Sequence, residues 1–356
     1  MRSLTGAFAY CSSLMSITIP SSVTTIGLRA FYGCTSLTSV TIGDSVTGIG
    51  YDAFWGCTSL TSISVDENHP NYKSIDGNVY SKDEKTLIQY AIGKTATSFV
   101  IPDSVTTIDN YALANCRNLK SIVIPDSVTT IGSSAFRGCS SLESLTIPFV
   151  GNRAGVTSSD TYQYPLGYLF GSWSYTGGVA TTQEYYASLH STTSTTYYIP
   201  SSLKSVTVTG GYIPTGAFSN CNGITNITLG DDVTGIGSSA FAGCKKLTSI
   251  VIPDSVTTIG SSAFYNCTSL TSIVIPDSVT SIGEHAFQSC DRLTSIVIPN
   301  SVTTIGDYAF DGCDSLTNIT IPDSVTSISR YAFSGCGITS IVIPDSVTSI
   351  GEGAFV

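Results

Sequence analysis

Charged side chains are scarce in this chain of 356 residues. They make up 11% of the sequence, well below the quarter that is usual in globular domains. The formal net charge is −10, with 15 basic residues against 25 acidic ones. Proteins that bind nucleic acid or anionic membranes need clustered lysine and arginine, so we expect neither kind of partner.

Long apolar runs are also absent, although 42% of the residues are hydrophobic. A helix that crosses a membrane needs a run of about 18 or more apolar residues. Residues 1–10 contain no basic stretch followed by an apolar stretch, so no export signal is visible. We therefore expect no membrane insertion in this chain.

The sequence contains few residues that could carry catalysis. The three histidines, His69, His190 and His285, lie in no metal-binding or catalytic-triad motif, and no phosphate-binding loop occurs. A polar cluster of Glu184, His190 and nearby tyrosines is the one catalytic alternative. We expect no enzyme, with no catalytic residue, no cofactor and no bound metal.

Cysteine reveals an internal repeat. Within three runs of the chain, successive cysteines are 23 residues apart, so all eleven occupy one position of a repeated unit. They are Cys11, Cys34, Cys57, Cys116, Cys139, Cys221, Cys244, Cys267, Cys290, Cys313 and Cys336. An odd number with one cysteine per unit argues against paired disulfides. We predict a ladder of free, buried thiols.

The repeated unit predicts one coil of a stacked array. In residues 270–290, alternation places Ile273 and Ile275 on the inner face of a short strand and Val274 on the outer face. Pro276 and Asp277 then turn the chain, and a buried Ala-Phe pair precedes the cysteine. Stacking should align the phenylalanines into a spine that Leu113 alone interrupts. About 13 such units can be counted, and the chain begins and ends within one, so we expect a fragment of a longer protein.

The motif L-x-x-I-x-I-P-x-x-V-x-x-I-G-x-x-A-F-x-x-C resembles the BspA-like, or Treponema pallidum-type, leucine-rich repeat over nearly the whole chain. The resemblance implies a β-rich, right-handed leucine-rich-repeat solenoid with a parallel sheet on its concave face. It also implies a secreted or surface protein of a host-associated microbe with a role in adhesion. We interpret residues 1–356 as a single array of this kind.

Two segments interrupt the period. Residues 66–95 carry a hairpin signal at Asp76-Gly77 and a second turn at residues 82–85, which together predict a small β-meander. Residues 149–202 form a longer insertion rich in aromatic residues, in which residues 167–171 could place a helix or turn against the array.

The aromatic side chains of the second insertion are candidate ligand-binding residues, because tyrosine and tryptophan are enriched at binding hot spots. The candidates are Tyr162, Tyr164, Tyr168, Trp173, Tyr175, Tyr185 and Tyr186. Alternatively, the insertion only covers the array. The outward strand positions Val251, Val274 and Val297 are further candidates, on a face of little chemical variety.

An aspartate recurs in the turn of most units, beside these outward strand positions. The row contains Asp44, Asp103, Asp126, Asp231, Asp254, Asp277, Asp323 and Asp345, with Asn300 in the same position. Stacked like charges repel, so we expect the carboxylates to cap the turns. Calcium binding is the alternative, although each unit offers one carboxylate.

These observations predict a non-catalytic protein-binding or adhesion module, extracellular or at a cell surface. The expected ligand is a host matrix or cell-surface protein. Two alternatives remain open: a structural spacer within a larger surface protein, and a glycan-binding protein that uses residues 149–202.

Overall fold

The structure is a computed structural model that describes residues 3–188 and 191–356. The chain divides into two compact units, and three segments form each of them. Unit 1 comprises residues 1–144, 168–179 and 200–202, and unit 2 comprises residues 145–167, 180–199 and 203–356.

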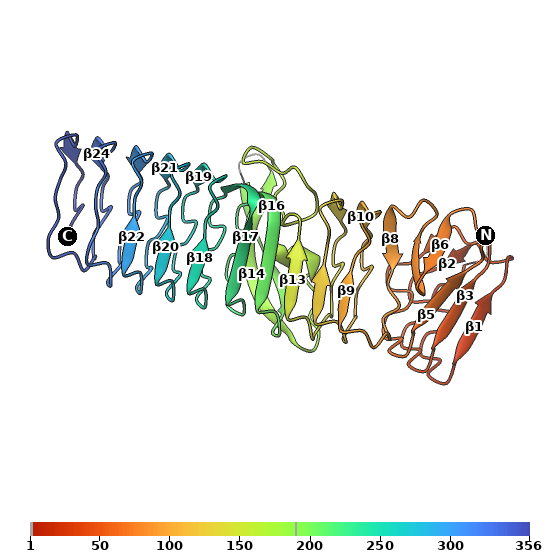
Figure 1. Cartoon of the computed structure of the whole chain (residues 1–356). Helices are drawn as coiled ribbons and strands as arrows, with labels where there is room; N and C mark the ends of the chain where they lie inside the picture. The colour runs from red at the N-terminus through yellow and green to blue at the C-terminus, as the bar shows by residue number, and fades with distance from the viewer. Residues whose placement is uncertain (1–2, 189–190) are drawn as a thin grey trace. The chain divides into compact units, whose positions relative to one another are not determined.

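Unit 1 is built from coils that each contribute two short parallel strands (Figure 1). The first strands pair in register, for example Val40 beside Ile17 and Ile63. They are β1 (Ser16–Ile19), β3 (Ser39–Ile42), β5 (Ser62–Val65), β9 (Ser98–Val100) and β11 (Ser121–Val123). The second strands are β2 (Thr25–Ile26), β4 (Gly48–Ile49), β10 (Thr107–Ile108) and β12 (Thr130–Ile131).

Residues 66–95 add three strands to unit 1. Antiparallel pairing joins β6 (Tyr72–Ile75) to β7 (Asn78–Ser81) and β7 to β8 (Thr86–Gln89). The tight turn between β6 and β7 holds Asp76 and Gly77 at positive φ, the conformation that this residue pair favours. β8 then pairs in parallel with β10, so the meander continues directly into the repeat.

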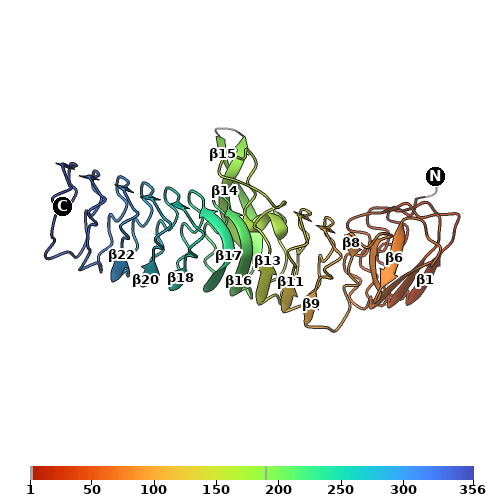
Figure 2. The same ribbon diagram turned by 45° about the horizontal axis from the view of Figure 1, so that its top comes forward.

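Unit 2 repeats the same coil. Its first strands are β13 (Ser144–Ile147), β16 (Ser205–Ile213), β17 (Asn226–Ile236), β18 (Ser249–Val251), β20 (Ser272–Val274) and β22 (Ser295–Val297). Its second strands are β19 (Thr258–Ile259), β21 (Ser281–Ile282), β23 (Thr304–Ile305), β24 (Ser327–Ile328) and β25 (Ser349–Ile350). The insertion adds a 3-10 helix, η1 (Leu166–Leu169), and a two-stranded sheet of β14 (Gly178–Ser188) and β15 (Ser191–Pro200), seen in Figure 2.

These parallel ladders confirm the predicted fold class, a right-handed β-rich repeat solenoid, which has about 14 turns. Two of the predicted units differ from the regular coil. The units at Ile319 and Ile341 form no named first strand, and a single bridge joins Ser295 to Asn318. The last coil is one residue short, so its second strand pairs at a spacing of 22 rather than 23, Ile328 with Ile350.

The core of each unit contains the residues that the repeat predicts. The inward-facing isoleucines of the strands, the turn valines such as Val256 and Val279, the alanines before phenylalanine, and nearly all of the phenylalanines and cysteines are buried. The phenylalanine rings form the predicted spine: Phe287 stacks on Phe264 and Phe310, with ring centroids 5.2 Å apart in both pairs. Leu113 is buried at its position in the spine.

The cysteine side chains are free thiols, and they also donate hydrogen bonds that the sequence did not predict. Eight of the eleven thiols donate to a backbone carbonyl of the preceding coil. Cys267 Sγ lies 3.2 Å from the Phe241 oxygen, and Cys290 Sγ lies 3.2 Å from the Phe264 oxygen. Cysteine therefore serves as a small hydrophobe that also satisfies a buried carbonyl.

His69 lies in unit 1 and is completely buried. Its Nδ1 accepts hydrogen bonds from the backbone N–H groups of Asn71 and Tyr72, at 3.1 and 3.0 Å. Burial lowers the pKa of His69 and outweighs the opposing effects of the Val46 backbone and of the Asp44 and Asp66 charges, while the charge of Lys82 lowers the pKa further. The neutral imidazole is thus part of the fold.

We expect unit 1 to lose stability between about pH 7.5 and about pH 5.5. In this range the unfolded chain protonates His69 near its ordinary pKa of about 6.5, while the lowered pKa in the folded chain shifts that protonation to more acidic pH. Urea unfolding midpoints at the two pH values measure this loss, and the H69N variant should reduce it. An equal loss in H69N would contradict the assignment, because the lowered pKa of Asp44 acts only at more acidic pH.

Candidate functional site

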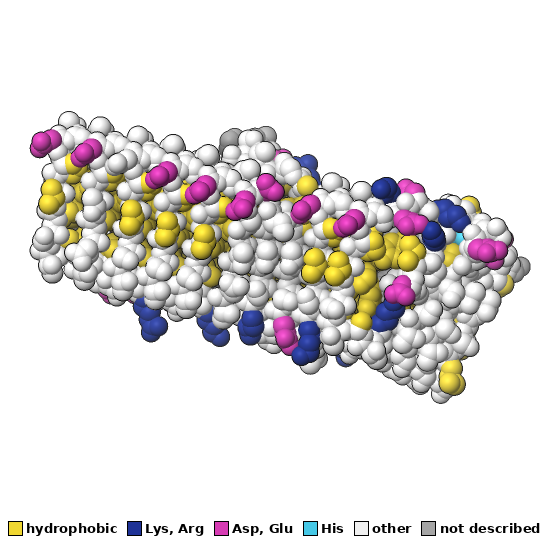
Figure 3. Space-filling model, in the orientation of Figure 1, with side chains coloured by type: hydrophobic (Ala, Val, Ile, Leu, Met, Phe, Trp, Pro, Cys, Tyr) yellow, Lys and Arg dark blue, Asp and Glu magenta, His cyan; other side chains and the backbone are white. Residues whose placement is uncertain are grey.

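Three exposed valines form a row on the sheet face of unit 2. The strands β18, β20 and β22 pair in parallel, which aligns Val251 with Val274 and Val274 with Val297. These side chains are 75%, 67% and 70% exposed. Figure 3 shows apolar side chains at intervals across this face. We call these three residues the valine row.

The row of aspartates runs alongside the valine row, and Figure 3 shows the acidic side chains in a line beside the apolar ones. In several coils the turn is also held by the serine that follows the aspartate. The serine after the aspartate ties the turn to the preceding coil: Ser278 Oγ donates to the Val256 oxygen at 2.6 Å. The Asp44 carboxylate accepts a hydrogen bond from Ser45. Among the described residues, no three His, Cys, Asp or Glu side chains are grouped so as to hold a metal ion.

Two buried glutamines hold the insertion against the coils of unit 2. The side-chain oxygen of Gln163 accepts the backbone N–H of Thr215, and that of Gln183 accepts the N–H of Gly167, both at 2.8 Å. The Gln183 side-chain amide also donates to the Ala217 oxygen. Both side chains are fully buried, so the insertion is anchored by specific polar contacts as well as by apolar packing.

Four of the candidate tyrosines lie beside these glutamines in unit 2. The rings of Tyr164 and Tyr185 are 5.5 Å apart, and the backbone oxygen of Tyr186 accepts a hydrogen bond from the backbone N–H of Gln163. Tyr162 is 53% exposed, whereas the other three are partly buried. The structure therefore brings the rings of Tyr164 and Tyr185 together.

The remaining three candidates, Tyr168, Trp173 and Tyr175, lie in unit 1. The segment around them replaces a coil. Phe136 donates its backbone N–H to the Leu169 oxygen at 2.9 Å, and the Phe170 ring packs on the Phe136 ring. The insertion therefore adds the Phe170 ring to the spine of unit 1, directly after the 3-10 helix η1.

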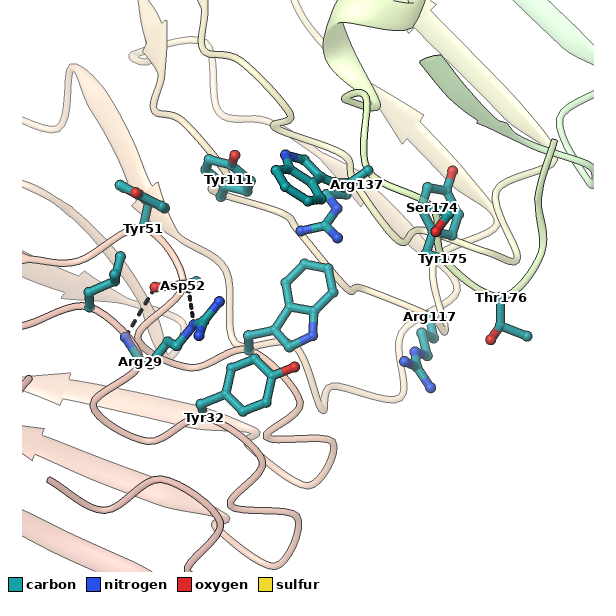
Figure 4. A pocket seen from close by; sticks show the side chains of 13 residues that line it. Arg29, Tyr32, Tyr51, Asp52, Tyr111, Arg117, Arg137, Ser174, Tyr175 and Thr176 are labelled. Carbon is teal, nitrogen blue, oxygen red and sulfur yellow. Dashed lines mark hydrogen bonds and ion pairs between the residues drawn. The ribbon is translucent and has the colours of Figure 1, made fainter. Parts of the chain in front are cut away.

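Trp173 and Tyr175 line a cavity of about 490 Å³ in unit 1, shown in Figure 4. The guanidinium of Arg137 lies over the ring of Trp55, 4.4 Å from its centroid. The side chains of Tyr51 and Tyr111 stack at 5.0 Å. We call this site the arginine–aromatic cavity.

The cavity walls carry an excess of positive charge. They contain three arginines, Arg29, Arg117 and Arg137, and one carboxylate, Asp52. Asp52 is already bound by Arg29, through the backbone N–H at 3.1 Å and Nε at 3.3 Å. This positive site contrasts with the net charge of −10 of the chain.

Most of the cavity residues were not predicted from the sequence. They occupy the variable positions that flank the buried Ala-Phe pair, such as Tyr51, Asp52 and Trp55 around Ala53-Phe54. The variation itself is a signal that the sequence offers: these positions differ between coils, while the strand positions repeat Ser and Val. The backbone here is also unusual, because the residue two before phenylalanine, for example Arg29 or His285, has a φ of 56°.

A second hollow, of about 470 Å³, lies at the corresponding edge of unit 2. It contains Glu184 and His285, and His285 Nδ1 is 2.8 Å from the Gln288 side-chain oxygen. The Gln288 amide in turn donates to Asp311. The His285 ring stacks on Tyr308. His190, which the catalytic alternative requires, lies outside the described residues.

Comparison with known proteins identifies the repeat. The model of the BspA type leucine-rich repeat region matches residues 5–89, 90–206, 186–295 and 280–356. No curated protein matches the chain. The only helix among the described residues is too short to cross a membrane.

Several solved structures are similar. A leucine-rich repeat protein from Bacteroides ovatus is 26% identical with a TM-score of 0.52, over 99% of this chain and 78% of that one. A leucine rich cell surface protein from Faecalibacterium prausnitzii is 30% identical with a TM-score of 0.32, over 95% and 79%. A leucine-rich repeat protein of T. pallidum is 20% identical with a TM-score of 0.35, over 70% and 89%. The chain therefore belongs to the BspA-type leucine-rich-repeat family.

Proposed function

We propose that this chain is a non-catalytic protein-binding module that acts in adhesion. Its location is extracellular or at a cell surface, and its ligand is a protein of a host matrix or of another cell. The family supports a binding role. The observation that carries the proposal is the valine row of unit 2.

The valine row exposes apolar surface that the fold does not need to expose. The strands already bury their inner isoleucines; Ile250, Ile273 and Ile296 are at most 5% exposed. Serine or threonine at the outer positions would serve solubility equally well, as Thr41 does in β3. Exposed apolar side chains that are aligned on a sheet face offer a contact surface for a partner, and the parallel pairing of β18, β20 and β22 keeps the three valines in line for such contact.

The valine row can be tested with a triple variant, V251T/V274T/V297T. Threonine keeps the shape and strand propensity of valine but replaces one methyl group with a hydroxyl. Burial of a methyl-sized group contributes about 0.8 kcal/mol. Loss of three such contacts, allowing for incomplete burial, should cost about 2 kcal/mol, or roughly 30-fold in Kd. The assay is surface plasmon resonance against a panel of purified matrix and cell-surface proteins.

A matched control changes a second exposed row in the same coils, T257S/T280S/T303S. It should bind as the unmodified chain does. If the valine variant and the control bind every panel protein that the unmodified chain binds with equal affinity, the valine row is not the binding surface. If no panel protein binds the unmodified chain, the spacer alternative gains support.

The glycan alternative is favoured by a different observation. Trp173 is 68% exposed and lines the arginine–aromatic cavity together with Tyr175. Exposed aromatic rings beside a cavity are suited to stacking on sugar rings. This second candidate function concerns unit 1 and is independent of the valine row.

A further inference from the structure

Arg137 lines the arginine–aromatic cavity, and one donor of its guanidinium has no hydrogen-bond partner among the described residues. Arg137 Nε is buried and forms no hydrogen bond within the part of the chain that the structure describes. Its guanidinium also has no ion pair among those residues, because the one carboxylate of the cavity, Asp52, is bound to Arg29. Because the Arg137 side chain lines the cavity, an oxyanion that enters can form a charge-assisted hydrogen bond with the guanidinium.

The surroundings of Arg137 favour this interaction. Its guanidinium lies over the indole of Trp55, and a guanidinium held by its face still offers N–H groups at its edge to a carboxylate or sulfate. Burial lowers the pKa of Arg137, which reflects a charged group that is poorly solvated. An incoming anion would replace the missing solvation.

The other walls of the cavity suit a sugar ring. Figure 4 shows the Tyr32 and Tyr111 side chains around Arg137. Burial raises the pKa of Tyr175, so its phenol is neutral and can exchange hydrogen bonds with sugar hydroxyls. Trp173 supplies an exposed aromatic face at the cavity. A volume of about 490 Å³ accommodates one or two sugar rings.

An extended peptide fits this site less well. Peptides that add to a protein usually pair with free backbone groups. Here the backbone is engaged between coils: Phe31 N donates to the Ala53 oxygen, Gly33 N to the Trp55 oxygen, and Tyr111 N to the Ser133 oxygen. A ligand of this cavity must therefore be recognised by side chains. These offer the N–H groups of arginine, the hydroxyls of tyrosine and the ring faces of tryptophan.

We propose that the arginine–aromatic cavity of unit 1 binds an acidic saccharide, with the carboxylate or sulfate on Arg137 and the sugar ring against Trp173. This inference deepens the glycan alternative and rests on it. It is separate from protein binding by the valine row.

The test measures binding of the whole chain by isothermal titration calorimetry to matched pairs of sugars. The carboxylated probe is 3′-sialyllactose, the sulfated probe is a sulfated lactose, and lactose is their neutral counterpart. At least one acidic sugar should bind about tenfold or more tightly than lactose, since hydrogen bonds between charged groups are strong. Comparison of the two acidic probes tells carboxylate from sulfate, and higher salt should weaken binding.

Variants locate the site. R137Q should weaken binding of the acidic sugar about tenfold or more, and W173A should weaken binding of acidic and neutral sugars alike. R292Q makes the same change of charge at an exposed arginine of unit 2 and should have no effect. Circular dichroism checks that R137Q remains folded, and W173A changes an exposed side chain that the fold does not need.

The possible results distinguish failure of the anionic site from failure of glycan binding as a whole. Equal binding of lactose and the acidic sugars, lost in W173A, would keep the glycan alternative and overturn the anionic site. No binding of any sugar at millimolar concentration would overturn both. Binding of a tyrosine- and glutamate-containing peptide in place of the sugars would overturn the saccharide assignment. Unchanged binding in folded R137Q would remove Arg137 from the site.

Discussion

The F287A variant should lose about 3–5 kcal/mol of stability, the usual cost of removing a buried phenylalanine side chain. Phe287 is fully buried and stacks between Phe264 and Phe310 with interplanar angles of 4°. Its removal leaves a cavity and breaks the aromatic contact to both neighbouring coils. Because each coil of a repeat protein contacts mainly its neighbours, the loss should be greatest near the substitution. Urea unfolding gives the total loss, and hydrogen exchange shows which coils open.

Two controls define this expectation. F355A removes a ring at the end of the described chain that is 39% exposed and stacks on Phe333 alone, so a much smaller loss is expected. F287L introduces the residue that already occupies the spine at Leu113 and should cost less than F287A. Equal losses in F287A and F355A would mean that the spine does not contribute through stacking between coils.

In the native protein, Cys11 should react rapidly with a thiol reagent, Cys336 should react slowly, and the other nine cysteines should remain unreactive. Cys11 is exposed, Cys336 is half-buried, and the others are buried. Reaction requires a thiolate, and burial raises the pKa of Cys57 to about 12 and holds those of Cys244 and Cys267 well above the ordinary value. The buried thiols therefore lack both access and charge.

The measurement is a time course with Ellman's reagent, followed by the same assay in guanidinium chloride, in which all eleven thiols should react. The C11S variant should lose the fast phase and nothing else. Rapid reaction of three or more native thiols would contradict the ladder of buried thiols. If fewer than eleven thiols react in the unfolded chain, some cysteines form disulfides. That result would contradict the structure, in which all eleven cysteines are free.

The coil itself was predictable because every buried position recurs with the same period. The strand residues, the Ala-Phe pair and the cysteine are chemically uniform, so their inward direction follows from local alternation and from the need to stack. The hairpin at Asp76-Gly77 was predictable for a local reason as well, since the backbone conformation of that turn depends on these two residues. The serine that follows the aspartate was not predicted to tie the turn to the preceding coil, and the turn-capping role of the aspartate row remains a prediction.

The insertion at residues 149–202 was less predictable. Its aromatic residues were recognised, but the sequence did not indicate that Phe170 enters the spine or that Gln163 and Gln183 are buried anchors. It also did not indicate that the candidates are divided between the two units. The binding roles of these residues and the boundaries of the proposed insertions remain predictions.

The sequence by itself determined the repeat, the buried face of each coil and the exposed valine row, because these depend on a short period that one coil already contains. Only the tertiary structure decided the arginine–aromatic cavity. Its residues lie far apart in the chain, from Arg29 to Thr176, and they meet because stacking superposes the variable positions of separate coils and the insertion adds Trp173 beside them. Periodicity specifies what each coil buries, whereas a binding site depends on how the irregular side chains of different coils come together.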